Sequence, residues 1–443
     1  MLSHREALLS ARRIEKIERG SNFKFVSDSS EFVENFVGLT KSHVASTRLS
    51  PHQITKIKRF HEKADLLSND VKKTLTLLED TEYPIVRIFH QPNTLIGLNI
   101  FGLIIAAQEL CSKIEKETNQ KPVVLFLFMD YDVAEDKSFR SPRLPNWHSN
   151  KTFYLPGAVK RDYRRRIASS LAKPDESEIQ KWIESLRQSS NTCFKKLNEI
   201  DEFLLTYRNK EEQTLLLKES FNRIYASANS LVEANANFIA WLSNRFFNYS
   251  TLFVSATELL ESSFERMVEI FEKDFFNNVG QSNYPITEIW AVCEICNERS
   301  RLAIANQQYN WICKCGNSSF FDKLSYKVFE AKNGFSLPTY YPNVHLCDLL
   351  EIYSYGLRVG VSYAGSIDHM ITSRSRIIEE CSTQILEFIW EPDNLFSKEK
   401  IRKVAIELDE VLIGDFIKGK YPILFYLQLY GKEHLVNIIR QSI

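Results

Sequence analysis

Four cysteines lie close together in the second half of the chain. Cys293 and Cys296 are separated by two residues, and Cys313 and Cys315 by one. Two closely spaced pairs of thiolates can complete a tetrahedral Zn²⁺ site, and Trp311, just before the second pair, suits a small β-hairpin ribbon. Because four cysteines leave no open coordination position, we expect a structural zinc ion rather than a catalytic one.

The spacing of the second cysteine pair leaves one alternative open. A C-x-C pair is less common than C-x2-C in such sites, so one ligand could come from His345 or Cys347 instead. The chain has 8 cysteines, and half of them fall between 293 and 315. This clustering favours a metal site in a reducing compartment over a disulfide framework, and we expect a cytoplasmic protein.

A second polar cluster, His90-Gln91-Pro92-Asn93, follows a short apolar run and precedes Gly97 and an apolar helical segment. An imidazole and a helix N-terminus at such a point can face the phosphates of a nucleotide, because the partial positive charge of the helix end favours anions. We therefore take His90, Gln91, Asn93 and Gly97 as candidate nucleotide-binding residues. The alternative is a histidine that is simply satisfied at a strand end.

Two further clusters could contact ligands. Asp130 and Asp132 follow an apolar run, and two carboxylates at this spacing can hold a substrate amine, a sugar hydroxyl or Mg²⁺. Gly365 would let the backbone approach a ligand, and Asp368 with His369 could reach ribose hydroxyls and a base or phosphate. The alternatives are a solvated acidic turn and the capped start of a helix.

The pattern along the chain predicts the scaffold that would position these clusters. Pro84–Phe89 is typical of a short buried strand, Leu95–Lys116 of a helix, and Val123–Met129 of a central parallel strand that is apolar on both faces. We expect further strands at Thr251–Val254 and from Val359. Strand, helix and strand form a βαβ unit, and ligand groups collect at the carboxyl ends of its strands. The fold class predicted is α/β with a Rossmann-like parallel sheet.

We expect six segments along the chain. They are a helical N-terminal segment (1–83), the first half of the core (84–170), a helical insertion with a return to the core (171–285), a zinc ribbon (286–322), the second half of the core (323–376) and a C-terminal helical segment (377–443).

Composition excludes several classes of protein. Of 443 residues, 44% are hydrophobic and 25% charged, which argues against wholesale disorder. Lys plus Arg and Asp plus Glu are both 56, so any attraction to nucleic acid or membrane must come from a local patch. The N-terminal charges argue against a signal peptide, and the longest uncharged run, 88–108, holds too many polar residues for a membrane span.

Other motifs are missing from the sequence or weak in it. There is no P-loop, GxSxG elbow or GxGxxG fingerprint, which argues against Walker-type ATPases, α/β-hydrolases and classical dehydrogenases. The basic run from Lys160 to Arg166 could contact RNA, but a solvated helix face is the favoured interpretation because acidic residues lie nearby.

Taken in order, several of these stretches resemble the cysteine-adding enzyme family of bacillithiol biosynthesis. They are Pro84–Phe139 with His90-Gln91-Pro92 and Asp130-Tyr131-Asp132, then Val232–Phe275, Tyr341–Leu346 and Gly360–His369. Members have a core similar to class I aminoacyl-tRNA synthetases and are assigned the joining of cysteine to a glucosamine-malate acceptor. By this resemblance the ligand cleft would be lined by His90, Gln91, Asn93, Asp130, Asp132, Gly365, Asp368 and His369. The chain differs from the family in having Tyr131 in place of a histidine and Asn93 and Thr94 where the family's loop has a glycine. It also has an added cysteine ribbon and lacks the family's long C-terminal coiled coil.

These observations predict a ligase-type enzyme that binds ATP or another nucleotide and joins an amino acid, cysteine in the family itself, to an amine acceptor. His90 would stabilise phosphate charge, Asp130 and Asp132 would hold the substrate ammonium, and Asp368 with His369 would contact the ribose or the second substrate. Ser397–Lys400 is a poor match for the lysine-rich loop of true synthetases. The alternatives are a non-catalytic adaptor whose ribbon and Arg-rich helix bind RNA or protein, and a tRNA synthetase relative. The sequence leaves the oligomeric state open.

Overall fold

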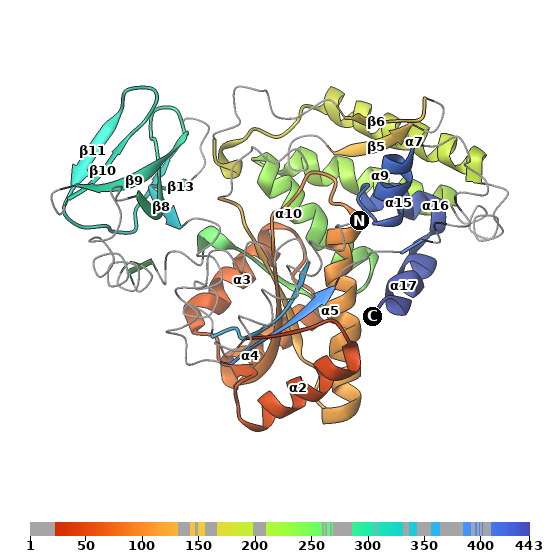
Figure 1. The fold of residues 1–443 in the computed structure, drawn as a ribbon, viewed down its shortest axis with the longest axis horizontal. Coiled ribbons are helices and arrows are strands. Elements are labelled where there is room, and N and C mark those ends of the chain that lie inside the picture. Colours follow the sequence, from red (N-terminus) through yellow and green to blue (C-terminus); the bar gives the residue numbers. More distant parts are fainter. Residues whose placement is uncertain are drawn as a thin grey trace. The chain divides into compact units, whose positions relative to one another are not determined.

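The computed structural model divides into two compact units. The sheet unit comprises Met1–Phe89, Leu110–Tyr131 and Ser250–Trp390, and the helical unit comprises His90–Glu109, Asp132–Tyr249 and Glu391–Ile443 (Figure 1). The structure describes residues 23–131, 142–146, 149–155, 166–197, 210–258, 261, 264–265, 268, 286–305, 308–330, 336–342, 356–363, 384–390, 395–396, 398, 401 and 409–443.

A mostly parallel seven-stranded sheet forms the centre of the sheet unit. Its path runs β1-β16-β15-β3-β4-β7, and β2 pairs antiparallel with β3 off this path. The strands are β1 (Phe23–Val26), β2 (Ser46–Thr47), β3 (Tyr83–His90), β4 (Val123–Phe128), β7 (Leu252–Ser255), β15 (Val359–Tyr363) and β16 (Ile385–Trp390). β15 pairs in parallel with β3 and β16, and β4 with β7. The predicted α/β class and the strands at β3, β4, β7 and β15 are confirmed.

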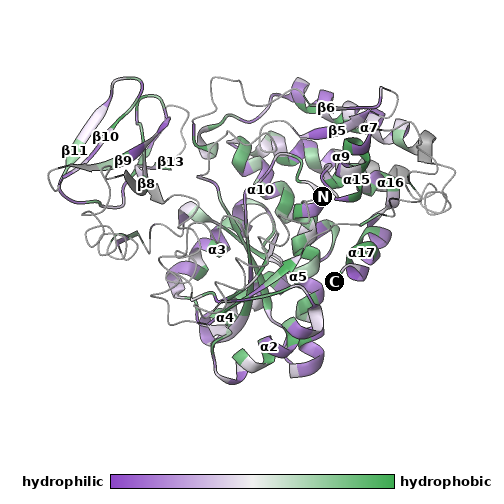
Figure 2. Cartoon of the chain, in the orientation of Figure 1, coloured by the Kyte–Doolittle hydropathy of each residue, from purple (hydrophilic) through white to green (hydrophobic). Residues whose placement is uncertain are grey.

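The order of these strands reverses beside β3. The chain passes from β3 to β4 and then to β7 in one direction, and it returns on the other side of β3 to form β15 and β16. All six residues of β4 are buried, as expected of an inner strand that is covered on both faces. Figure 2 shows hydrophobic residues concentrated in the central sheet. In open parallel sheets such a reversal marks the place where ligands bind.

The sheet unit also contains helices α2 (Ser29–Lys41), α3 (Pro51–Lys63) and α4 (Asn69–Asp80), together with the C-terminal part of α5 (Leu98–Thr118). The side chains of Asp28, Ser50 and Ser68 cap the first three, each accepting backbone N–H groups of the first turn. Phe32 of α2 meets Phe388 of β16 edge-on, with ring centroids 5.4 Å apart. Aromatic contacts of this kind fix the helices against the sheet.

A second sheet of the sheet unit, the cysteine sheet, is antiparallel with order β11-β10-β9-β8-β14. Its strands are β8 (Ile286–Val292), β9 (Arg299–Ala305), β10 (Gln308–Ile312), β11 (Ser318–Phe321) and β14 (Tyr340–Pro342). Leu302, Tyr309 and Trp311 are buried on one face, whereas Ile312 and Phe320 are exposed. β12 (Val328–Glu330) and β13 (Ser336–Pro338) pair as a separate ladder.

The helical unit contains α7 (Glu176–Leu197), α9 (Lys210–Ser227), α10 (Leu231–Trp241), the π-turn η4 (Leu242–Phe246), α15 (Glu410–Ile417), α16 (Ile423–Tyr430) and α17 (Lys432–Gln441). It also holds the 3₁₀ turn η2 (Ala168–Ser170) and the hairpin β5 (Arg143–Asn146) and β6 (Lys151–Tyr154). Phe396, Tyr426 and Tyr430 stack, with ring centroids about 5 Å apart, in its core. Across the described residues no helix is long and apolar enough to cross a membrane.

Three strands of the central sheet correct the sequence analysis. β1 and β2 lie in the segment 1–83, and β16 lies in the segment 377–443, whereas both segments were expected to be helical. β1 is four residues long and β2 only two, so they carry too little periodic signal to be recognised. β16 contains Glu387 in the middle of an apolar run, and a charge at an inner position hides a buried strand.

Candidate functional site

The four cysteines predicted as metal ligands come together at the end of the cysteine sheet. The Sγ atoms of Cys293, Cys296, Cys313 and Cys315 all lie within 4.8 Å of one another. Cys293 Sγ is 3.5 Å from Cys315 Sγ, and Cys296 Sγ is 3.4 Å from Cys313 Sγ. Tetrahedral Zn–S bonds of about 2.3 Å place sulfur atoms roughly 3.8 Å apart, so the cluster has the size of a metal site.

Each cysteine pair is held by a tight turn that requires an unusual backbone. Asn297 follows the first pair with φ 58°, and Gly316 follows the second with φ 90°. The Asn297 N–H donates to the Cys293 carbonyl at 2.8 Å, and the Gly316 N–H to the Cys313 carbonyl at 3.0 Å. Asparagine and glycine tolerate this left-handed conformation best, so the residues after each pair are suited to the turn.

The local hydrogen bonds favour a thiolate at Cys293. Burial raises the pKa of the Cys293 thiol, but donors from Asn317 and from the N–H groups of Cys296 and Ile295 lower it by more, to about 7. Asn317 Nδ2 lies 3.5 Å from Cys293 Sγ.

The four sulfur atoms converge even though the second cysteine pair has C-x-C spacing. The alternative ligands His345 and Cys347 lie outside the described residues.

The loop after β3 is firmly anchored within the helical unit. Asn235 of α10, which is 1% exposed, donates Nδ2 to the Pro92 carbonyl at 2.9 Å and to Thr94 Oγ1 at 3.1 Å. Its Oδ1 accepts the hydroxyl of Tyr225. Leu95 has φ 47°, a strained value for a branched residue, which this anchoring must hold in place. Asn235 was not recognised in the sequence, because a lone asparagine in a helical pattern carries no signal.

Within this loop the predicted ligand-binding residues are arranged as follows. His90 ends β3 and is half-buried, and its Nδ1 lies 3.0 Å from the Gln91 carbonyl. A carbonyl only accepts, so in the neutral imidazole the proton resides on Nδ1. Asn93 is buried, and its N–H donates to the same Gln91 carbonyl at 2.9 Å. The tight turn therefore orients His90 at the carboxyl end of an inner strand.

The N-terminus of α5 differs from what the sequence analysis expected. Its first two N–H groups, from Leu98 and Asn99, donate to the carbonyls of Tyr421 at 3.0 Å and Gly419 at 2.8 Å. The N–H groups of Ile100 and Phe101 donate to the carbonyl of Gly97. The first four donors of the helix are thus engaged by protein carbonyls, and this helix end offers none of them to a phosphate.

Gly97 has a packing role at the same point. A Cβ atom on Gly97 would lie 2.6 Å from Asn99 Oδ1 and 3.3 Å from the Lys420 carbonyl. Gly97 also forms an isolated antiparallel bridge with Pro422. The close approach of the segment 419–422 explains the glycine without any ligand.

Asp130 connects the carboxyl ends of two neighbouring strands. Its Oδ2 accepts the hydroxyl of Ser255 at 2.7 Å, and its Oδ1 accepts the N–H of Thr257 at 2.9 Å. Burial raises the pKa of Asp130 above its ordinary value, although these hydrogen bonds oppose the shift. The carboxylate therefore holds β4 against the end of β7. The other candidates Asp132, Gly365, Asp368 and His369, and the basic residues 160–165, lie outside the described residues.

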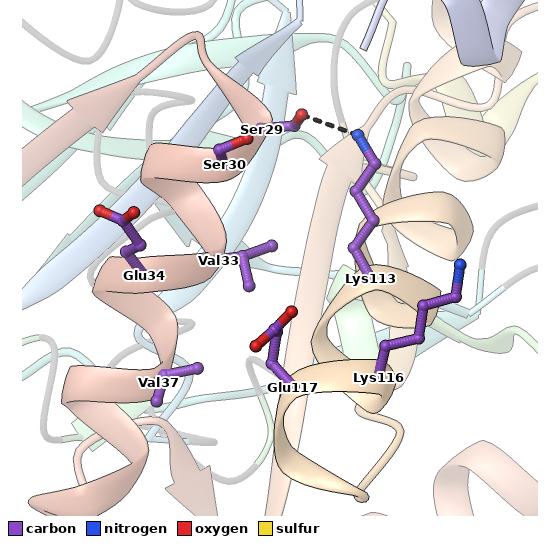
Figure 3. A pocket seen from close by; sticks show the side chains of 8 residues that line it. All are labelled: Ser29, Ser30, Val33, Glu34, Val37, Lys113, Lys116 and Glu117. Carbon is purple, nitrogen blue, oxygen red and sulfur yellow. Dashed lines mark hydrogen bonds between the residues drawn. The ribbon is translucent and has the colours of Figure 1, made fainter.

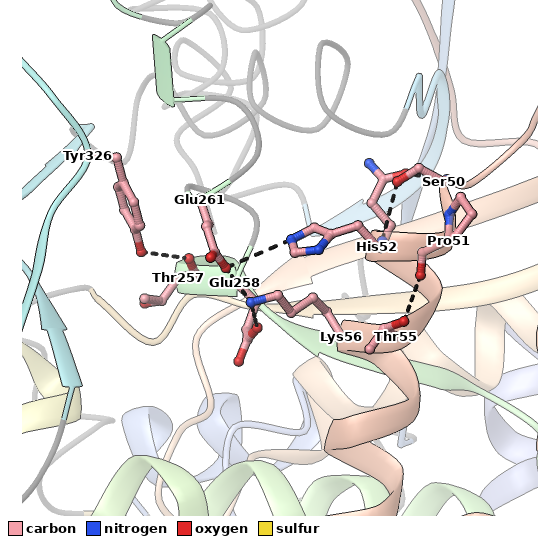
Figure 4. Close-up of polar contacts among 10 residues, drawn as sticks. Ser50, Pro51, His52, Thr55, Lys56, Thr257, Glu258, Glu261 and Tyr326 are labelled. Carbon is pink, nitrogen blue, oxygen red and sulfur yellow. Dashed lines mark hydrogen bonds and ion pairs between the residues drawn. The ribbon is translucent and has the colours of Figure 1, made fainter.

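A charged cluster that the sequence analysis missed lies beside Thr257 (Figure 4). Lys56 Nζ of α3 is 2.9 Å from Glu258 and also pairs with Glu261, and His52 Nε2 lies 3.9 Å from Glu261. Burial lowers the pKa of Lys56, but the two carboxylates raise it by more, so the net shift is upward. Glu258 and Glu261 are three positions apart, a spacing that places them on one helix face but is too common to signal a site.

A groove of about 510 Å³ lies between α2 and α5 (Figure 3). It is lined by Ser29, Ser30, Val33, Glu34, Val37, Lys113, Lys116 and Glu117. Lys113 Nζ donates to Ser29 Oγ at 2.7 Å, and Asp28 occupies the first N–H groups of α2. The groove therefore has mixed charge, and the end of α2 is already capped.

No protein-family profile matches this chain, and no curated protein matches it significantly.

Proposed function

We propose that this protein is a nucleotide-binding enzyme that joins an amino acid to an amine acceptor, with its ligand at the carboxyl edge of the central sheet. The observation that carries the proposal is the reversal of strand order between β3 and β15. In open parallel sheets, ligands bind outside the carboxyl ends of the strands at such a switch point. The predicted ligand residues follow these strands in the chain, since His90 ends β3 and Gly365 to His369 come soon after β15.

The proposed roles are revised by the hydrogen bonds. His90 and Gln91 are the candidates to contact phosphate oxygens, because the N–H groups at the start of α5 are engaged elsewhere. Asp368 and His369 keep their proposed role at the ribose. The resemblance to the cysteine-adding enzymes supports amino acid ligation and suggests cysteine as the first amino acid to try.

We also propose that the four cysteines bind one structural Zn²⁺ ion in a zinc ribbon. The donor set supports zinc because thiolates prefer it and because four sulfurs leave no position for substrate. The ion would hold together the two turns that carry the cysteine pairs.

The proposed function is tested by titrating the zinc-loaded protein with ATP in a calorimeter. We expect micromolar binding that is weakened at least tenfold in His90→Ala, because a half-buried imidazole at the strand end would be lost. His43→Asn is the matched control, since His43 is exposed in the sheet unit and its φ of 57° suits asparagine.

Turnover is tested separately with amino acid-dependent exchange of pyrophosphate into ATP, starting with cysteine. Exchange would support adenylation of the amino acid carboxylate. If the folded wild-type protein binds neither ATP nor ADP, the nucleotide-dependent ligase is wrong.

A further inference from the structure

One face of the cysteine sheet is exposed and has an unusual composition. In β9, β10 and β11, residues that pair directly or alternate along a strand share a face. The pairs Ala303 with Asn310, and Asn310 with Phe320, therefore define one face across three strands. This face, here the open face, carries Arg299, Arg301, Ala303, Gln308, Asn310, Ile312, Ser318 and Phe320.

Two large apolar side chains of the open face are left in water. Ile312 is 68% exposed and Phe320 is 67% exposed. They are diagonal neighbours, because Ile312 pairs with Ser318, two residues before Phe320. The opposite face buries Leu302, Tyr309 and Trp311, so the sheet has already satisfied its own core. An aromatic and an aliphatic residue side by side on the second face indicate a binding surface.

The same face continues into a cationic and aromatic stack on β8. Trp290 pairs directly with Arg301, and the Cζ atoms of Arg299 and Arg301 lie 4.1 and 5.1 Å from the centroid of its ring. Stacking on an indole holds a guanidinium group in a fixed plane, and its N–H donors then point outward in that plane, as at the exposed Arg301. This arrangement suits oxygen acceptors of a planar or anionic ligand.

We propose that the open face binds single-stranded nucleic acid. The positions named on β9, β10 and β11 include two arginines and no carboxylate. Asp322, which follows β11, is the one carboxylate placed on this side by the described contacts, and it accepts the amide of Gln308 at 2.8 Å. Two arginines beside an exposed aromatic ring match a polyanion with stacking bases better than they match a protein.

The dimensions of the face agree with this ligand. Three strand spacings separate β11 from β8, about 14 Å in all. Sheet surfaces of this width in other nucleic acid-binding modules stack two or three bases on aromatic side chains. Phe320 would stack one base, Ile312 would pack beside it, and Arg301 would contact a phosphate. The proposal does not depend on the ligase activity, and a nucleotide titration of the central sheet would not alter it.

The test is fluorescence anisotropy of the zinc-loaded full chain with a fluorescein-labelled 12-nucleotide oligouridylate and with the matching double-stranded RNA. We expect the single strand to bind more tightly than the duplex. Phe320→Ser should weaken binding roughly tenfold, the loss expected for one stacked base. Arg301→Gln should weaken binding and reduce the slope of log K against log salt by about 0.7, the value for one phosphate contact to a single strand.

Matched controls are Val411→Ser, which removes another exposed apolar side chain, and Arg59→Gln, which removes an exposed arginine of α3. One zinc ion per chain shows that each variant keeps the cysteine sheet. The proposal is overturned if the wild-type chain does not bind the oligonucleotide at 50 mM salt, or if Phe320→Ser and Arg301→Gln bind as the controls do. It is also overturned if sedimentation shows that the open face pairs two copies of the chain.

Discussion

Arg87 of β3 and Glu387 of β16 form a buried ion pair across the intervening strand β15. Both side chains are at most 1% exposed, and Ser362 of β15 adds a hydrogen bond from its hydroxyl to Glu387 Oε2 at 3.0 Å. Gly360 of β15 lies beneath the pair, and a Cβ atom there would collide with Arg87 Nη1 and lie 2.8 Å from Glu387 Oε2. The glycine therefore leaves room for two charged side chains to meet over the middle of the sheet.

We expect either single substitution of this pair to destabilise the sheet unit by about 3–5 kcal/mol, because each leaves an uncompensated buried charge. Urea unfolding of Glu387→Gln and Arg87→Met measures this change. The double variant Arg87→Met with Glu387→Met should recover most of the loss, because both buried charges are removed together. If the double variant loses as much free energy of unfolding as the two single variants lose in sum, the two side chains are not coupled.

The pair of Arg87 and Glu387 explains why β16 could not be predicted from the sequence although other strands could. β3, β4, β7 and β15 were predicted because their apolar runs are bounded by polar or glycine residues. β16 was missed because Glu387 looks like a surface residue until its partner Arg87, 300 positions away, is placed beside it. Long-range pairing of charges has no local signature in a single sequence.

In the candidate site, too, some features could be predicted from the sequence and others could not. The spacing of the cysteines was sufficient to predict the cluster, because the ligands are close in sequence and their chemistry is specific. The role of Asp130 and the occupied start of α5 could not be predicted, since they depend on Ser255 and on the segment 419–421 far along the chain. Lys56 with Glu258 and Glu261 is ordinary in sequence and becomes a cluster only in the fold.

Removal of the metal should unfold the cysteine sheet. We expect one zinc ion per chain by emission spectrometry, and Cys313→Ser should lose it because apparent zinc affinity in such modules is folding free energy. Trp311 is 5% exposed, so its fluorescence should shift to longer wavelength when the sheet opens. Cys111→Ala, in a buried helical position outside the cluster, is the control that should retain zinc. Full zinc content in Cys313→Ser would contradict the assignment of the ligands.

His61 of α3 should make the sheet unit sensitive to acid. Its Nε2 accepts the N–H of Phe253 at 3.1 Å, and burial lowers its pKa from 6.5 to about 4. The unfolded chain therefore takes up the proton first as the pH falls. The stability is complete above pH 6.5 and is lost between pH 6.5 and 4, by up to about 3 kcal/mol.

The pH dependence is measured by urea unfolding at pH 7.5, 6, 5 and 4 in wild-type protein and His61→Gln. Glutamine can accept the Phe253 N–H but does not titrate, so the slope between pH 6.5 and 4 should decrease. The exposed residue His43, changed to Asn, serves as the control for loss of a histidine outside the core. An unaltered slope in His61→Gln would assign the acid sensitivity to other groups.

Asn235 should set the conformation of the loop that carries His90. Asn235→Leu removes the buried donor to the Pro92 carbonyl, so we expect a loss of about 1–3 kcal/mol in the helical unit. Tyr225→Phe should cost less, because the amide of Asn235 keeps both of its contacts to the loop. If the loop contacts a nucleotide, ATP affinity should fall in Asn235→Leu and be nearly retained in Tyr225→Phe. Equal effects of the two variants would argue that Asn235 acts only through the helix core.

Asp130 gives a test that separates holding the strands together from binding a substrate. Burial raises the pKa of Asp130 in the folded protein, so folding favours the protonated carboxyl group. The ionised carboxylate, present at high pH, therefore contributes less to stability than the protonated group contributes at low pH. Asp130→Asn imitates the protonated form: Oδ1 can accept the Thr257 N–H, and Nδ2 can donate to Ser255 Oγ. We expect unchanged or higher stability at pH 7, whereas Asp130→Ala should lose about 1–3 kcal/mol.

The same variants decide whether the carboxylate also holds a substrate ammonium. Calorimetric titrations with ATP and with cysteine are compared for the wild-type protein and Asp130→Asn. If Asp130 only holds the strands together, the wild-type protein and Asp130→Asn should bind each ligand equally well, because the fold is kept. Loss of cysteine binding at unchanged ATP affinity and stability would instead show that the carboxylate itself is needed, since asparagine has the same shape but is neutral and carries a donor in place of one acceptor oxygen.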